Sequence, residues 1–358
     1  MPRQYSWGSF LARVRAPFVP STPGAPRTRT PGQGPSDAPG RRGPLVRVLA
    51  VGLALVTVSS CAVRTDQIAR DPGVVRMALN GWVGYEASAE VLAYILRTEM
   101  GYDVQLIRTD EQPSWQALDQ GVLDVIVENW GHDDLMELYG PDGNGTVVDG
   151  GPNGNVGGIG WYIPGYVADA YPGITTADGL REHTDIFRTA ETGEKGEFLG
   201  GAPGFVTQDE GMINAFDLDL EIVFAGSEAS QITEVRRRYA NEEPVLFYFY
   251  DPQWLQEELE LVRVDFPPWK PGCDEDLEWI PCDYPQYHMN KIFRTGFVEA
   301  DEPSYQFLDN WTWTNGQQND VARMIADEGL DSEEAAAIWV EENRDVWEPW
   351  IPEGAAGR

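Results

Sequence analysis

Aromatic side chains near the ends of expected strands are the groups in this sequence best suited to bind a ligand. The faces of Trp and Tyr rings carry partial negative charge and attract a quaternary ammonium group, which has no ordinary hydrogen bond to offer. Several such rings around one cavity would form a cage for an organic cation. Because Trp is usually well buried, packing in the protein core is the alternative. The candidate ligand-binding residues are Trp82, Trp130, Trp161, Tyr162, Tyr250 and Trp254.

The first two tryptophans follow strands of one expected α/β segment. Residues 74–79 and 122–127 are apolar runs typical of strands, and Trp82 and Trp130 come shortly after them. The order strand, helix, strand, helix, strand predicts a parallel sheet with right-handed crossovers. In such sheets ligands bind beyond the carboxyl ends of the strands, so both rings should face one crevice. The intervening elements are expected at residues 86–100, 102–107 and 114–120.

A second α/β lobe and a helical C-terminal part are expected after a glycine-rich stretch. Residues 139–160 contain nine glycines, which indicates a domain edge. The pattern beyond them predicts strands at 157–166, 221–224 and 245–250 and helices at 176–184, 210–216 and 230–240. The last part should be helical at 305–311, 319–328 and 331–343. Its tryptophans should pack in the core; they are Trp311, Trp313, Trp339, Trp347 and Trp350.

Composition indicates a globular protein with an acidic surface. Of the 358 residues, 42% are hydrophobic and 23% are charged, and the formal net charge is −32. Residues 1–60 hold 8 of the 26 Lys and Arg residues but only 1 of the 58 acidic residues, so the rest of the chain is more acidic still. Such a surface repels nucleic acid and anionic lipid headgroups, which argues against both as partners. The surface would also attract cations weakly, but this does not indicate a binding site, because strong acidity also increases solubility.

The N-terminal part indicates a disordered leader followed by a secretion signal. Residues 1–44 are rich in Pro, Gly, Ser, Thr and Arg and lack apolar periodicity. Three arginines then precede an apolar run at 48–58, which is too short to span a bilayer comfortably. The Val-Ser-Ser-Cys sequence at 58–61 resembles a bacterial lipobox. It implies cleavage before Cys61, lipidation of the Cys61 sulfur and a tether at 61–73.

The remaining reactive residues indicate a crosslink rather than catalysis. Cys273 and Cys282 are the cysteines left besides Cys61, and an exported protein favours a disulfide between them. A metal pair is the alternative, but no further Cys or His lies at ligand spacing. The sequence has no Gly-x-Ser-x-Gly elbow, phosphate loop or His-Glu-x-x-His motif, and its three histidines are scattered. We therefore expect no catalytic residue, no metal site and no cofactor.

Several segments together resemble one known family. They are the strand before Trp82, Glu-Met-Gly-Tyr-Asp-Val at 99–104, Trp-Gln-Ala-Leu at 115–118, Gly-Val-Leu-Asp-Val at 121–125, Glu-Asn-Trp at 128–130, residues 204–240, and Tyr-Asp-Pro-Gln-Trp at 250–254. They resemble the solute-binding lipoproteins of ABC importers for glycine betaine, choline and related quaternary amines. The resemblance covers nearly all of residues 74–350. This family often has Trp-x-Pro-His-Trp at the last segment, so Tyr250 and Gln253 replace a Trp and a His. The segment between Cys273 and Cys282 is an insertion outside the common pattern.

The resemblance implies a bilobal α/β fold of the type II periplasmic-binding-protein kind, with two lobes joined by a hinge. Trp82 and Trp130 would come from one lobe, and Trp161 and Tyr250 from the other lobe or the hinge. The expected organisation is a disordered leader and lipoprotein signal at 1–60, a tether at 61–73, lobe 1 at 74–155 plus 290–358, and lobe 2 at 156–289.

The function implied by the resemblance is capture of a quaternary amine for import, as in osmoprotection. The closed form would be presented to an ABC permease and its ATPase. The protein would be exported and either lipid-anchored to the outer face of the bacterial cell membrane or periplasmic, and it would bind no nucleic acid. Two alternatives stay open. One is an exported enzyme acting on a small amine, which would need an acid, a base or a metal near the cage. The other is a solute-sensing binding protein without a dedicated importer.

Overall fold

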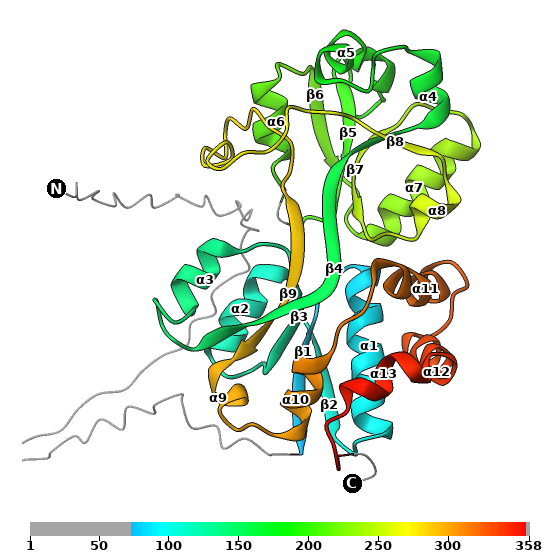
Figure 1. The fold of residues 1–358 in the computed structure, drawn as a ribbon. Helices are drawn as coiled ribbons and strands as arrows, with labels where there is room; N and C mark the ends of the chain where they lie inside the picture. Colours follow the sequence, from blue (N-terminus) through cyan, green and yellow to red (C-terminus); the bar gives the residue numbers. More distant parts are fainter. Residues whose placement is uncertain (1–72, 206, 356–358) are drawn as a thin grey trace, which may run out of the picture. The chain divides into compact units, whose positions relative to one another are not determined.

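A computed structural model describes residues 73–205 and 207–355. The expected leader, the secretion signal, Cys61 and the tether up to residue 72 lie outside the described residues. The described strands form a nine-stranded sheet in the order β2-β1-β3-β9-β4-β7-β5-β6, with β8 paired to β4 (Figure 1). The strands are β1 (Val74–Leu79), β2 (Asp103–Arg108), β3 (Val125–Asn129), β4 (Val147–Pro164), β5 (Gly196–Gly200), β6 (Leu220–Phe224), β7 (Leu246–Asp251), β8 (Leu261–Arg263) and β9 (Gln286–Arg294).

Helices follow the strands up to β8, and after β9 the C-terminal part is helical, as expected. The α-helices are α1 (Val83–Thr98), α2 (Glu111–Asp119), α3 (Asp133–Tyr139), α4 (Gly165–Ala170), α5 (Ala177–Glu182), α6 (Asp209–Ala215), α7 (Glu228–Ala240), α8 (Leu255–Glu258), α9 (Thr295–Val298), α10 (Pro303–Asn310), α11 (Asn315–Ala326), α12 (Ser332–Glu342) and α13 (Arg344–Trp347). Two 3-10 helices, η2 and η3, cover Thr184–Phe187 and Glu348–Trp350.

The first three strands form the parallel arrangement that the sequence predicts. β1 pairs in parallel with β2 along its whole length and with β3 at Met77 and Val125. The apolar and β-branched side chains of these strands suit a sheet that is covered on both faces. Because β1 and β3 are neighbours, Trp82 and Trp130 both follow the carboxyl ends of adjacent strands.

Helix α1 begins at Val83, three residues before the expected start. Its N-cap residue, Trp82, has no side-chain oxygen to accept from the first N–H groups. The Glu228 carboxylate of α7 accepts a hydrogen bond from Val83 N instead, at 2.7 Å. A negative charge at a helix N-terminus is favourable because of the helix dipole. A residue that is distant in sequence thus supports this boundary.

Strands β4 and β9 connect the two ends of the sheet and are antiparallel to their neighbours. β9 pairs with β3 on one side and with β4 on the other, and β4 also pairs with β7 and β8. The sequence pattern did not predict β9. The glycine-rich stretch at 139–160, which we expected at a domain edge, contributes from Val147 onward to β4. Register shifts between Asp149 and Val156 accommodate its glycines.

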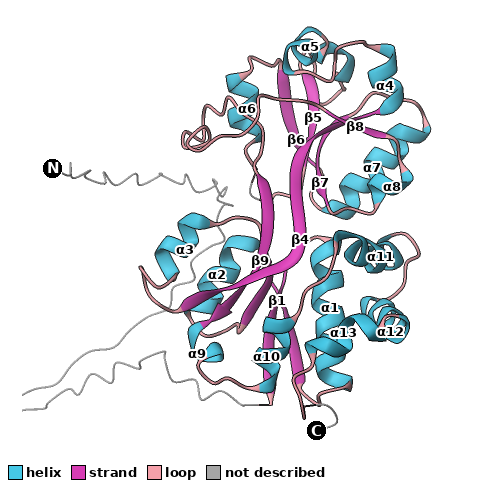
Figure 2. Ribbon diagram, viewed as in Figure 1, coloured by secondary structure: helices cyan, strands magenta, loops and turns pink. Residues whose placement is uncertain are grey.

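Two parts of the sheet are distinguished by their helices. The β1 part consists of β1, β2 and β3 with α1, α2, α3, α11 and α12. The β5 part consists of β5, β6 and β7 with α6 and α7. In the β1 part, α1 packs against α11 and α12 on one side of the strands, and α2 and α3 lie on the other side (Figure 2). β4 and β9 run side by side between the two parts (Figure 1).

The C-terminal helices close the core of the β1 part. All five tryptophans that we expected there are buried, and the Trp339 and Trp350 rings stack at 6.3 Å between centroids. A capping box between Thr314 and Gln317 starts α11, and Asp331 caps α12 through Glu333 N. Within the described residues, no helix has both the length and the apolar character needed to cross a bilayer.

Candidate functional site

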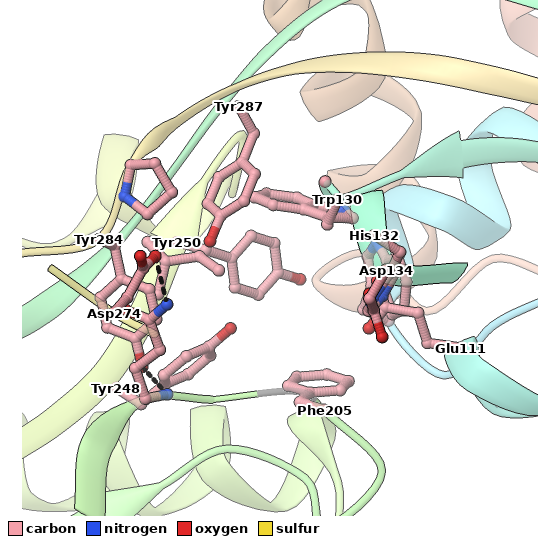
Figure 3. A pocket seen from close by; sticks show the side chains of 15 residues that line it. Glu111, Trp130, His132, Asp134, Phe205, Tyr248, Tyr250, Asp274, Tyr284 and Tyr287 are labelled. Atoms are coloured by element: carbon pink, nitrogen blue, oxygen red, sulfur yellow. Dashed lines mark hydrogen bonds and ion pairs between the residues drawn. The ribbon is translucent and has the colours of Figure 1, made fainter. Parts of the chain in front are cut away.

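A cavity of about 210 Å³ lies where the carboxyl ends of β1 and β3 approach β7 and the segment that leads into β9 (Figure 3). Seven of its fifteen lining residues are Trp, Tyr or Phe. Its volume suits a small solute. The lining residues are Trp82, Glu111, Trp130, Gly131, His132, Asp134, Ile159, Phe205, Gln208, Tyr248, Tyr250, Asp274, Tyr284, Pro285 and Tyr287.

Glu128, on β3, holds both tryptophans of the β1 part. Trp82 Nε1 donates to Glu128 Oε1 at 2.8 Å, and Trp130 Nε1 donates to the same oxygen at 2.9 Å. Glu128 Oε2 accepts from Gln318 Nε2 at 2.7 Å. Burial raises the pKa of the Glu128 carboxyl, whereas the three donors favour its charged form. Because both indole N–H groups are occupied, these rings offer a ligand aromatic surface.

The Trp130 ring contacts aromatic residues of two other strands. Its ring centroid lies 5.7 Å from that of Tyr250 on β7 and 5.5 Å from that of Tyr287 on β9, both in edge arrangements. Figure 3 shows these three side chains around the same space. Gly157 on β4 makes this possible, because a Cβ there would lie 2.6 Å from a Trp130 ring carbon. The fold therefore brings three predicted cage residues, Trp82, Trp130 and Tyr250, to one cavity.

Glu228 accepts a hydrogen bond from Tyr250, as Glu128 does from the two tryptophans. The Tyr250 hydroxyl donates to Glu228 Oε1, and Gln253 Nε2 donates to the same oxygen at 2.7 Å. Val83 N donates to Glu228 Oε2 at 2.7 Å. Burial raises the pKa values of both the Glu228 carboxyl and the Tyr250 hydroxyl. Gln253 lies outside the cavity lining and shares the Glu228 oxygen that accepts from Tyr250.

Asp209, at the start of α6, is a third buried carboxylate that holds aromatic side chains. Its Oδ1 accepts from Trp161 Nε1 at 2.7 Å and from the Tyr284 hydroxyl at 2.8 Å. Burial raises the pKa of Asp209 to about 6. Tyr284 lines the cavity, and Phe205 and Tyr248 pack beside each other there with ring centroids 6.1 Å apart.

Polar side chains lie on two opposite sides of the cavity: Glu111, His132 and Asp134 on one side, and Asp274 on the other (Figure 3). His132 Nε2 lies 3.0 Å from Glu111 Oε1, and His132 Nδ1 lies 3.9 Å from Asp134 Oδ1. Burial alone would lower the pKa of His132, but the contact with Glu111 and the nearby negative charges raise it. Gln208 Nε2 donates to Asp274 Oδ2 at 3.2 Å. Among the described residues, no Lys or Arg lines the cavity.

The other three predicted ligand residues lie away from this cavity. Trp161 is fully buried, and its ring packs against Phe198 at 4.4 Å between centroids. Tyr162 lines a separate cavity. Trp254 is 2% exposed, and the Arg236 guanidinium lies 4.9 Å from its ring centroid. The structure therefore does not bring these three together with Trp82.

Several lining residues and their supports were missed from the sequence. Tyr248 could have been found, because it stands two residues before Tyr250 and strand residues at i and i+2 share a face. Phe205, Tyr284 and Tyr287 carry no such signal. Glu128, Glu228 and Asp209 could not be recognised either, because a buried acid looks like any other in so acidic a chain.

Cys273 and Cys282 are joined by a disulfide, and the loop that they close reaches the cavity through Asp274. The loop is held on α6, where Ile280 N donates to Gly211 O at 3.0 Å. In residues 73–205 and 207–355, no group of three or more His, Cys, Asp or Glu residues is arranged to hold a metal ion.

The mixed sheet and its cavity define an α/β fold of the type II periplasmic-binding-protein kind. The chain belongs to the family described as the substrate binding domain of ABC-type glycine betaine transport systems, whose model matches residues 73–342. Its members are substrate-binding proteins of glycine betaine and choline type ABC transport.

Individual relatives are distant in sequence. The chain is 21% identical over 311 residues to the trimethylamine N-oxide-binding protein of Pelagibacter ubique, which covers 84% of this chain and 98% of that protein. Lactococcal OpuAC in its closed form with glycine betaine superposes with a TM-score of 0.61 at 20% identity, over 78% of this chain and 99% of OpuAC. An ABC-transporter choline binding protein in complex with choline gives a TM-score of 0.64 at 20% identity, over 80% and 94%. These structural likenesses establish the fold.

Proposed function

We propose that this protein captures a small quaternary amine in the aromatic cavity and delivers it to an ABC permease and its ATPase. The observation that carries the proposal is the shared anchoring of Trp82 and Trp130 on Glu128. With their N–H groups occupied, the indoles offer π surface, and Tyr250 adds a third ring. A desolvated cation on an aromatic face gains up to about 2 kcal/mol per ring.

Charge supports the same ligand class. The lining contains carboxylates from Glu111, Asp134 and Asp274. Aromatic faces and carboxylates both favour a positive ligand head, and neither favours an anion. Betaine, choline, carnitine and trimethylamine N-oxide share a trimethylated nitrogen that fits this description.

Capture would proceed by closure of two lobes, residues 74–155 plus 290–358 and residues 156–289. Contacts that join these segments at the cavity include the hydrogen bond from Val83 N to Glu228 and the ring contacts of Trp130 with Tyr250 and Tyr287 and of Trp82 with Phe205. A ligand between the aromatic walls would favour the closed form, which the permease would recognise.

We further infer that the exported protein is anchored through a lipid on Cys61. The apolar run that ends in the lipobox-like sequence at 58–61 supports this inference. The Cys61→Ala variant should be released from the membrane fraction into the soluble fraction. Retention of this variant in the membrane would contradict the anchor.

Calorimetric titration of the purified chain against choline, glycine betaine, carnitine, proline betaine and trimethylamine N-oxide tests the proposed function. We expect saturable one-to-one binding of at least one of these solutes. Trp82→Ala and Trp130→Ala should each weaken it roughly tenfold or more, and both together should abolish it. Phe224→Ala serves as the control, because Phe224 is 52% exposed and outside the cavity lining. Absence of binding to the whole panel, or unchanged affinity in both tryptophan variants, would refute the proposal.

A further inference from the structure

The lining of the cavity carries acids on two opposite sides, which can receive positive charge and hydrogen-bond donors. Three lining residues carry carboxylates, and no lining residue within the described part of the chain is a Lys or an Arg. His132 is the one lining side chain that can carry positive charge, and Glu111 and Asp134 already face its two nitrogens at 3.0 and 3.9 Å. A carboxylate on a ligand would find no unpaired cation here.

Asp274 is the acid whose position depends on the disulfide loop. It follows Cys273 directly, and its Oδ2 accepts from Gln208 Nε2 at 3.2 Å and from Trp269 Nε1 at 2.9 Å. Its Oδ1 accepts no hydrogen bond within the described residues. Figure 3 shows Asp274 and Tyr287 on the same side of the cavity. The charge of Asp274 contributes, after burial and Glu111, to the raised pKa of Tyr287.

The acids behind the aromatic rings cannot take the role of Asp274. Both oxygens of Glu128 and both oxygens of Glu228 accept hydrogen bonds from protein donors, and neither residue is in the cavity lining. The hydroxyls of Tyr248 and Tyr287 can donate or accept, so they do not discriminate between ligands. Glu111 and Asp134 already face His132, so Asp274 is the lining acid that decides what the polar end of the ligand must be.

On the basis of the proposed function, we propose that the cavity prefers quaternary amines with a net positive charge and a hydrogen-bond donor at the polar end, as in choline. Zwitterions and N-oxides, whose polar ends only accept, are disfavoured. Asp274, delivered by the loop between Cys273 and Cys282, is the specificity-determining residue. Burying a ligand carboxylate beside Asp274 without a donor or a cation is unfavourable, whereas a ligand hydroxyl that donates to Asp274 is stabilising.

Paired titrations test this preference, because choline, glycine betaine and trimethylamine N-oxide share the trimethylated nitrogen. The wild-type protein should bind choline at least about tenfold more tightly than either of the other two, the size expected for a hydrogen bond to a charged group. Equal or tighter binding of glycine betaine or the N-oxide would overturn the inference and leave the proposed function standing. Failure of all three ligands and of the rest of the panel would refute both.

The role of Asp274 is tested separately by Asp274→Asn. Choline affinity should fall roughly tenfold while affinity for glycine betaine stays constant or rises, so the ratio between the two narrows. Glu275→Gln is the matched control, because it removes a neighbouring acid of the same loop that is exposed and outside the lining. Replacing both loop cysteines by serine should narrow the ratio in the same direction. An equal loss of affinity for both ligands in Asp274→Asn, or an unchanged ratio, would contradict the specificity role.

Discussion

Glu128 in the β1 part and Glu228 in the β5 part both accept hydrogen bonds from aromatic side chains of the cavity, but among the described residues only Glu228 also accepts one from the other part. Glu128 accepts from Trp82, Trp130 and Gln318, which all belong to the β1 part or directly follow its strands. Glu228 accepts from Tyr250 and Gln253 and also from Val83 N at the start of α1. The β1 part thus organises its own wall, whereas the β5 wall is completed by a contact with the other part.

Under the proposed function, this difference separates two tasks of the cavity, which are ligand recognition and closure. A wall that is organised internally can hold its shape before the ligand arrives. A carboxylate that reaches across can respond to whether the two parts are close together. Removing Glu128 should therefore damage the recognition surface, and altering Glu228 should mainly change the balance between open and closed forms.

Glu128→Ala should have the largest effect on binding. It leaves two indole N–H groups and the Gln318 amide without their acceptor, so both rings lose their fixed orientation. We expect an affinity loss of about a hundredfold or more, measured by titration with the tightest ligand of the panel. Glu128→Gln keeps one oxygen acceptor and should lose less. Equal behaviour of the two variants would argue that charge, and not the shared anchor, is what matters.

Asp209→Asn should change how stability depends on pH. Burial raises the pKa of Asp209 to about 6 in the folded protein, above its ordinary value of 3.8. The folded state therefore holds this proton more tightly, and stability falls as the pH rises from about 4 to 7. The size of this decline is about 3 kcal/mol. Chemical denaturation across this range should show that the free energy of unfolding of the variant rises relative to that of the wild type as the pH rises. A constant difference would contradict the raised pKa.

Loss of the disulfide should lower the free energy of unfolding by an amount similar to, or slightly smaller than, the pH effect at Asp209. The crosslink belongs to the side of the cavity formed by the β5 part, and it closes a short loop. Replacing both cysteines by serine should lower the free energy of unfolding by roughly 2–3 kcal/mol at most. Mass spectrometry of the native protein should find no free thiol at either position. Two free thiols would refute the crosslink.

Glu228→Gln should have the smallest effect and tests the comparison most selectively. Its amide oxygen can still accept from Tyr250 and Gln253, but the amide nitrogen cannot accept from Val83 N. We expect affinity to fall roughly tenfold or less. Small-angle scattering of the ligand-free variant should show a more expanded molecule than the wild type, which Glu128→Ala should not. The same expansion in both variants would remove the distinction between the two carboxylates.

The sequence predicted the β1 wall better than the β5 wall for a physical reason. Parallel neighbouring strands deliver the residues after their carboxyl ends to the same edge, so Trp82 and Trp130 could be placed from strand positions alone. Trp161 lies within the antiparallel strand β4, and its side chain packs against Phe198 on the buried side. Trp254 follows β7 but pairs with Arg236. For Trp161 and Trp254, a position in or near the end of a strand did not determine whether the side chain points into the cavity.

Long-range partners account for most of what the sequence could not predict. The crossing strands β4 and β9 depend on pairing between segments more than 120 residues apart. The start of α1 depends on Glu228, and the orientation of Trp82 depends on Glu128, which lies 46 residues later in the sequence. Asp274 reaches the cavity through an insertion whose path follows from a disulfide and from contacts with α6. Local periodicity carries none of these relations.

The most direct test of cation recognition compares one ligand pair on the wild-type protein. The tightest-binding quaternary amine of the panel is titrated beside its neutral isostere, in which carbon replaces the ammonium nitrogen. The isostere keeps the shape and the apolar area and removes the charge. The aromatic cavity predicts that it binds at least roughly tenfold more weakly. Equal affinity for the two would mean that the rings recognise apolar shape alone, and it would contradict the cage.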